Sequence, residues 1–249
     1  MLGQQYASAP LMKTKNPVRI VTTPAAGNGG MHGISTPDQV VTAVKRRVLQ
    51  GKLVPGQRLV EAELTREFDV SRGPVREALK RLAAEGVITL SRHRGAFVRV
   101  LTRREATELL HVVQALIGLA VRDASLKLDR GRNLARLDSA YEKLARHAPS
   151  SERATQSTDR NRFYDTILEI ADNLELQRLY PVVPTQILRM QVHPHLSGGD
   201  KARQFSDYQH LYRAMRAGDS VRAQRVVTLH TRRSRMEIRK LPDAAFEIT

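Results

Sequence analysis

Three cations recur at four-residue intervals in one segment of the chain. Arg72, Arg76 and Lys80 stand at positions that share one face of an α-helix. In the major groove of DNA, arginine can donate two parallel hydrogen bonds to guanine, and both Arg and Lys attract phosphates. Ser71, at the start of the segment, could add a phosphate contact together with nearby backbone N–H groups. The spacing therefore indicates a helix that reads duplex DNA.

A second basic feature follows this segment closely. Arg94 and Gly95 lie at the tip between residues 87–90 and 96–100, two stretches that alternate like β-strands. A tip that contains glycine is thin enough for its arginine to enter a minor groove. The cation spacing alone would favour a solvated face with salt bridges to residues such as Glu77. The order of basic helix, hairpin and basic tip is the one that a winged helix requires, and it favours DNA binding.

The preceding residues predict the elements that would hold this surface. Thr36 caps a first helix with Pro37 in its first turn, and Gly51 ends that helix. Residues 61–68 form a short second helix, and Ser71 caps the third. Three helices followed by a two-stranded hairpin predict a winged helix-turn-helix domain over residues 35–101.

The remainder of the chain has a helical pattern from Thr102 to Lys240, opened by a capping box of Thr102 and Glu105. Helices are predicted near 103–127, 132–147, 155–171, 174–192, 201–217 and 220–240. Pro181 and Pro184 should kink the fourth or delay its start. The predicted fold class is mainly α: an N-terminal winged helix-turn-helix with a small β-hairpin, then an all-α antiparallel helical bundle. Residues 102–240 are expected to be an effector-binding and dimerisation domain, 1–34 a disordered tail and 241–249 a C-terminal tail.

Composition supports a polyanionic partner. The 249 residues carry a formal net charge of +16, and residues 35–104 hold 15 Lys and Arg against 7 Asp and Glu. Cysteine is absent, and no apolar run reaches the roughly 18 residues of a membrane span. We therefore expect a cytoplasmic protein with double-stranded DNA as partner and no membrane association.

The segment 36–101 resembles the GntR family of bacterial transcriptional regulators. The matching residues are Gly51-Lys52-Leu53, Pro55-Gly56, Leu59, Glu61, Leu64, Val70-Ser71-Arg72, Pro74 to Leu79, Arg81-Leu82, Glu85-Gly86 and Arg94-Gly95. Residues 105–238 are similar to the helical FCD sensor domain of its FadR-type branch. The resemblance implies a dimeric repressor that responds to a small metabolite, often a carboxylate. It assigns base and phosphate reading to Arg72 and Arg76, and the wing tip to Arg94 and Gly95.

Many sensor domains of this branch bind a divalent metal through one Asp and three His. The resemblance places Arg160, Tyr164, Tyr208 and His230 at those four positions. A guanidinium repels a cation and neutral phenols are poor ligands for zinc-like metals, which leaves His230 alone as a normal ligand. The usual metal site is therefore predicted to be lost, and no cofactor is expected.

The same four residues could instead bind an anion. An Arg, two phenols and an imidazole could hold a carboxylate or phosphate directly, with Arg189 on a neighbouring helix as a further candidate. Alternatively, the phenols and the imidazole are satisfied polar core groups and effector binding has been lost. Val113 and Ile117, where related domains often have Arg and Glu, make the pocket more apolar, which favours a less polar ligand or none.

Two other functions compete with a ligand-responsive regulator. The overall charge would also suit a nonspecific architectural protein that coats DNA. An enzyme is not expected, because the sequence has no nucleophile elbow, phosphate-binding loop, cysteine, or acid and base pair of defined spacing.

Overall fold

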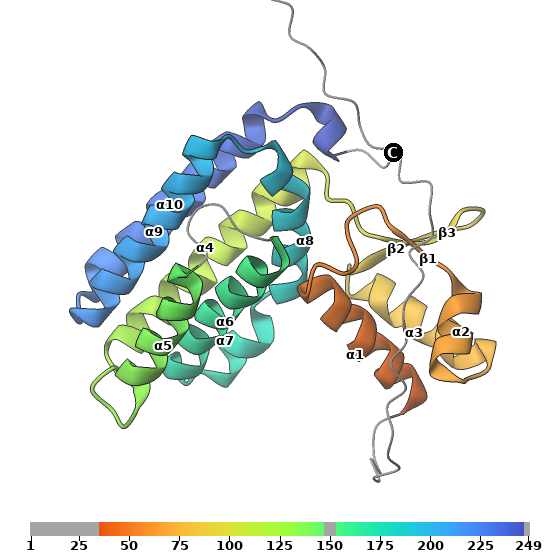
Figure 1. The fold of residues 1–249 in the computed structure, drawn as a ribbon, viewed down its shortest axis with the longest axis horizontal. Coiled ribbons are helices and arrows are strands. Elements are labelled where there is room, and N and C mark those ends of the chain that lie inside the picture. The colour runs from red at the N-terminus through yellow and green to blue at the C-terminus, as the bar shows by residue number, and fades with distance from the viewer. Residues whose placement is uncertain (1–34, 147–152, 247–249) are drawn as a thin grey trace, which may run out of the picture. The chain divides into compact units, whose positions relative to one another are not determined.

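The computed structural model describes residues 35–146 and 153–246 (Figure 1). The predicted N-terminal tail lies outside the described residues, as do the last three residues of the predicted C-terminal tail. The described part is mainly helical with one small antiparallel sheet, which confirms the predicted fold class.

The first group of elements is a winged helix-turn-helix. Its elements are α1 (Thr36–Leu49), β1 (Arg58–Leu59), α2 (Glu61–Phe68), α3 (Arg72–Ala84), β2 (Ile88–Ser91) and β3 (Gly95–Val98). Helix α3 buries Val75, Ala78, Leu79 and Leu82, and α1 contributes Val40, Val44 and Val48 to the same core. Burial of one face of α3 leaves its opposite, basic face to solvent.

The sheet has three strands, not the two that the sequence predicts. The strand order is β1-β3-β2, with Arg58 opposite Phe97 and Leu59 opposite Ala96. The alternation of strand residues needs several positions to be recognised, and β1 has two.

The first helix begins one residue away from the predicted cap. The N-cap is Ser35, whose hydroxyl accepts from the Asp38 N–H at 3.4 Å, so the assignment of this role to Thr36 is wrong. Pro37 lies in the first turn, as predicted, where its missing N–H breaks no helical hydrogen bond.

The second group consists of helices with two short 3-10 turns. They are α4 (Arg103–Ser125), α5 (Asn133–Ala145), α6 (Arg153–Ala171), α7 (Leu174–Leu179), α8 (Val182–Val192), η1 (His193–His195), α9 (Gly198–Arg216), α10 (Ser220–Lys240) and η2 (Asp243–Phe246). Helix α4 packs against α6, α9 and α10, and α5 packs against α6 (Figure 1). The predicted capping box is present: Glu105 Oε2 accepts from the Thr102 N–H at 2.8 Å, and Thr102 Oγ1 from the Glu105 N–H at 3.2 Å.

The predicted helix over 174–192 is two helices, α7 and α8. Pro181 is the N-cap of α8, and the helix is interrupted there because a proline cannot continue the preceding helix. Pro184 lies in the first turn of α8, where its missing N–H breaks no helical hydrogen bond. The helix that contains it thus starts late, as the sequence predicts.

Gln191 on α8 forms hydrogen bonds with two segments that are distant from it in sequence. Its Oε1 accepts from the Leu101 N–H at 3.0 Å, and its Nε2 donates to the carbonyls of Leu101 and Ala245, each at 2.8 Å. Ala245 is buried and belongs to η2, so the segment after α10 is packed and not merely a trailing end.

Candidate DNA-binding surface and effector cavity

The predicted recognition helix presents its cations together. Arg72, Arg76 and Lys80 are all exposed along α3, opposite its buried face. Ser71 is the N-cap of α3 by backbone geometry, but its side chain makes no capping hydrogen bond. The Ser71 hydroxyl therefore accepts no hydrogen bond from the first backbone N–H groups of α3. The surface has the cation spacing that a major-groove helix needs, and direct reading of bases by these residues stays a prediction.

Arg76 differs from its neighbours because it is already ion-paired. Its Nε lies 3.1 Å from Oε2 of Glu61, the first residue of α2. Both side chains are solvent-exposed, so water screens the pair and a phosphate or base can compete for the guanidinium. Glu61 can therefore hold Arg76 in place before DNA arrives.

The wing tip brings a cation that the sequence analysis missed. Gly95 has φ +90°, a conformation open to glycine, and a Cβ there would lie 3.7 Å from the Arg58 guanidinium. Arg94 lies with its guanidinium carbon 5.6 Å from the centre of the Phe97 ring. Arg58 is exposed on β1, the strand that the pattern did not reveal, so it joins Arg94 as a candidate for phosphate contact.

The four positions of the expected metal site do come together. Arg160, Tyr164, Tyr208 and His230 all line one cavity of about 50 Å³. Val113 and Ile117 line it as well, as the expectation of a more apolar pocket requires. An adjoining cavity of about 70 Å³ shares Arg160, Tyr208 and His230 and is bordered by Arg189. The five predicted effector residues thus line two adjoining cavities.

The two arginines form the electrostatic centre of these cavities. Arg160 is 7% exposed, and its buried Nε has no hydrogen-bond partner. Arg189 Nη1 donates to the Tyr208 hydroxyl over 3.4 Å, a long contact. Among the described residues neither arginine forms an ion pair with a carboxylate. Arg160 is buried and Arg189 is half-buried. A buried cation that pairs with no carboxylate is costly, since burial removes the water that would stabilise its charge.

Aromatic rings enclose this centre. The Arg160 guanidinium lies 5.3 Å from the centre of the Tyr164 ring, and the rings of Tyr164 and Tyr208 meet edge to face at 6.2 Å. Tyr180 and Thr185 also line the cavity. The sequence analysis missed these last two residues because both lie near the break between α7 and α8, where no helical register connects them to the other residues of the site.

The donor set does not fit a metal ion. Arg160 is a buried cation at one of the four positions, and the phenols of Tyr164 and Tyr208 occupy two more. Across 35–146 and 153–246, no group of three or more His, Cys, Asp or Glu side chains is placed to hold one. The chemistry of these residues suits an anion instead.

Charge alters the acidity of the phenols. Burial raises the pKa of Tyr208, but the guanidinium charges of Arg189 and Arg160 outweigh this effect and leave it below the ordinary value. Tyr164 shows the opposite balance, since burial and the neighbouring Tyr208 raise its pKa despite Arg160. Burial also raises the pKa of Tyr180. The hydroxyl of Tyr208 therefore ionises more easily than an ordinary phenol, because two guanidiniums lie beside it.

We expect one tyrosine of the free protein to ionise below the ordinary pKa of about 10. Near-ultraviolet titration should show this early phenolate step, and the Tyr208→Phe variant should lack it. Because the folded-state pKa is lower than the unfolded one, ionisation of Tyr208 stabilises the fold at alkaline pH, and the gain is lost as pH falls through the folded-state value. A Tyr164→Phe variant is the control; persistence of the early step in Tyr208→Phe would contradict the assignment.

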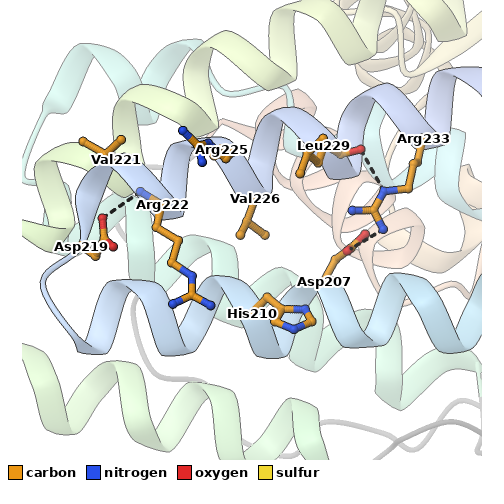
Figure 2. A pocket seen from close by; sticks show the side chains of 9 residues that line it. All are labelled: Asp207, His210, Asp219, Val221, Arg222, Arg225, Val226, Leu229 and Arg233. Carbon is orange, nitrogen blue, oxygen red and sulfur yellow. Dashed lines mark hydrogen bonds and ion pairs between the residues drawn. The ribbon is translucent and has the colours of Figure 1, made fainter.

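An open groove of about 400 Å³ lies on the outer side of the site, between α9 and α10 (Figure 2). Arg222, Arg225 and Arg233 are among its lining residues. Asp207 and Val226 line both this groove and the inner cavity, so they form the wall between the two spaces. Asp207 is a further residue of the site that the sequence analysis did not single out.

The described helices include none with the length and apolar composition that crossing a membrane requires. This finding agrees with the composition of the chain.

Comparison with known proteins identifies both parts of the chain. Residues 36–98 match the family described as "Bacterial regulatory proteins, gntR family", and residues 108–233 match the FCD domain. The chain is 29% identical over 204 residues to the gluconate operon transcriptional repressor of Bacillus subtilis strain 168, covering 79% of this chain and 81% of that protein. It is 25% identical over 194 residues to the probable D-xylose utilization operon transcriptional repressor of Paenarthrobacter nicotinovorans, covering 77% and 84%.

The fold agrees with these matches. The solved structure of E. coli McbR/YncC is similar with a TM-score of 0.70 at 20% identity, covering 84% of this chain and 99% of that chain. The winged helix-turn-helix, the helical domain that follows it and the family matches together lead to one conclusion. The chain belongs to the GntR family of bacterial regulatory proteins, carries an FCD domain, and is a DNA-binding transcriptional regulator.

Proposed function

We propose that this regulator is a homodimeric operon repressor in the cytoplasm whose DNA binding is changed by a small carboxylate. The carboxylate is held without a metal ion between Arg160 and Arg189, and the protein is not an enzyme. The two relatives described above are named operon repressors, which supports the direction of regulation. A twofold dimer would place two α3 helices on the half-sites of a palindrome.

The observation that carries this proposal is that the buried Arg160 and the half-buried Arg189 pair with no carboxylate among the described residues. A bound carboxylate would supply the missing negative charge and could accept two parallel hydrogen bonds from Arg160. The cavities, of about 50 and 70 Å³, are much smaller than the roughly 300–1,000 Å³ of pockets for drug-sized ligands. An acid of a few carbon atoms is therefore the favoured class.

Selection of duplexes from a random pool at physiological salt tests the proposal with the full-length protein. We expect enrichment of one short palindrome, and a change in its affinity when butanoate or its hydroxylated analogues are added. Equal affinity for the selected and the scrambled duplex would favour the nonspecific architectural protein instead. A palindrome whose affinity no small carboxylate changes would reject the proposed effector and keep the DNA-binding function.

A further inference from the structure

The wall between the inner cavity and the outer groove contains a buried carboxylate with both oxygens engaged. Asp207 is 6% exposed. Its Oδ2 lies 2.9 Å from Nδ1 of His230, and its Oδ1 lies 3.1 Å from Nη1 of Arg233. Figure 2 shows Arg233 reaching Asp207 from the groove side. Asp207 thus connects a half-buried arginine that lines the outer groove to an imidazole that lines the inner cavity.

This contact fixes which nitrogen of His230 carries a proton. An ionised carboxylate can only accept, so Nδ1 of His230 must donate to Asp207. In a neutral imidazole the other nitrogen, Nε2, is then an acceptor. His230 lines both inner cavities, and the hydrogen bonds of the described residues include no partner for Nε2. The site therefore offers Nε2 of His230 as a hydrogen-bond acceptor beside two guanidinium donors.

We propose that Asp207 is a positioning residue of the effector site: it fixes His230 so that Nε2 accepts a hydrogen bond from a hydroxyl group of the bound acid. The inference rests on the proposed carboxylate site and names its ligand class, a hydroxy acid. The carboxylate takes the place of the missing counter-ion of Arg160 and Arg189, and the hydroxyl donates to His230. An ammonium group could also donate to an imidazole, but the two guanidinium charges repel it. Of the two carboxylates that line the cavities, Asp207 and Glu237, Asp207 is already held by His230 and Arg233.

Matched acids test the ligand class on the unmodified protein. The probes are butanoate, 2-hydroxybutanoate, 3-hydroxybutanoate and 2-aminobutanoate, with binding measured by calorimetry at slightly alkaline pH. We expect at least one hydroxy acid to bind about tenfold more tightly than butanoate, because butanoate has no hydroxyl group that can donate to Nε2. The amino acid should bind more weakly than either hydroxy acid.

The variant Asp207→Asn tests the role of Asp207. Arg233 can keep the amide oxygen as its acceptor, which turns the amide N–H₂ toward Nδ1 of His230. Nδ1 must then accept, and Nε2 carries the proton. We expect the tenfold preference for the hydroxy acid to disappear while butanoate affinity changes little. The nitrogen chemical shifts of the His230 ring should report the exchanged proton directly, a signal that a purely structural role would not move.

The matched control is Asp219→Asn, which makes the same chemical change at the outer groove. Asp219 caps α10 by accepting from the Arg222 N–H at 2.9 Å, and asparagine caps equally well. The control should keep the preference for the hydroxy acid. Equal affinities of hydroxy and plain acids for the unmodified protein would overturn the inference and leave the carboxylate site intact, as would an unchanged preference in Asp207→Asn. Failure of all four acids to bind would overturn the proposed carboxylate effector, and the inference with it.

Discussion

Replacement of Arg72 with alanine is expected to weaken binding to the selected operator about 10- to 100-fold, with a much smaller loss on scrambled duplex. Arg72 is exposed near the start of α3 and forms no ion pair with any described residue. It can therefore enter the major groove without first breaking a contact. A bidentate contact to guanine contributes about 1–3 kcal/mol of discrimination between bases, which sets the expected range.

Arg76→Ala is expected to weaken operator binding as well, by a smaller factor. Its guanidinium must exchange Glu61 for DNA, so part of the gain on binding is offset by the lost pair. If Arg76 mainly contacts phosphate, the variant should lower the affinity for all sequences and reduce the slope of log affinity against log salt by about 1. Fluorescence anisotropy on operator and scrambled duplexes over a salt series separates the two roles.

Arg178→Ala is the control for both variants. Arg178 is an exposed arginine on α7 that pairs with Glu175 on the same helix, so it carries the same charge away from α3. It should alter operator affinity little. Unchanged affinity in correctly folded Arg72→Ala and Arg76→Ala would contradict the assignment of α3 as the recognition helix.

The DNA-binding surface could be predicted because its information is local. The interval from Arg72 to Lys80 places three side chains on one helix face whatever the rest of the chain does. Arg58 could not be predicted as part of the surface because its position beside Gly95 depends on the pairing of β1 with β3. This pairing joins residues almost forty positions apart. Two-residue strands have no pattern of their own, so only the folded sheet reveals them.

The effector cavity was predictable in part. Resemblance to the family brought Arg160, Tyr164, Tyr208 and His230 to one place, and the cavity confirms their convergence. Asp207 could not be inferred in the same way. The adjacent residue, Tyr208, also faces the cavity. The sequence does not reveal that the Asp207 carboxylate contacts α10, where His230 and Arg233 bind its two oxygens.

Arg160 is the residue whose replacement is expected to have the largest effect on the effector response. Arg160→Met keeps an unbranched apolar stem and removes a charge that is buried without a carboxylate. Truncation of one partner of a buried charge pair costs about 2–5 kcal/mol of binding, so affinity for the acid should fall about 100-fold or more. Differential scanning fluorimetry with and without the tightest-binding acid measures this loss. At 100 times the dissociation constant the acid should stabilise the unmodified protein by about 2.7 kcal/mol, and most of this gain should vanish in the variant.

The stability of the free variant then distinguishes a binding residue from a core residue. Arg160→Met should unfold at the same temperature as the unmodified protein or a higher one, because an unpaired buried charge costs more to desolvate than a thioether does. Arg162→Met, an exposed position on the same helix, should change neither stability nor response. A large loss of stability with the acid response retained would mean that Arg160 is a satisfied core group held by the three phenols around it. If the variant is at least as stable as the unmodified protein and loses the response to the acid, Arg160 is a binding residue. The protein then keeps a destabilising charge at this position because a ligand neutralises it.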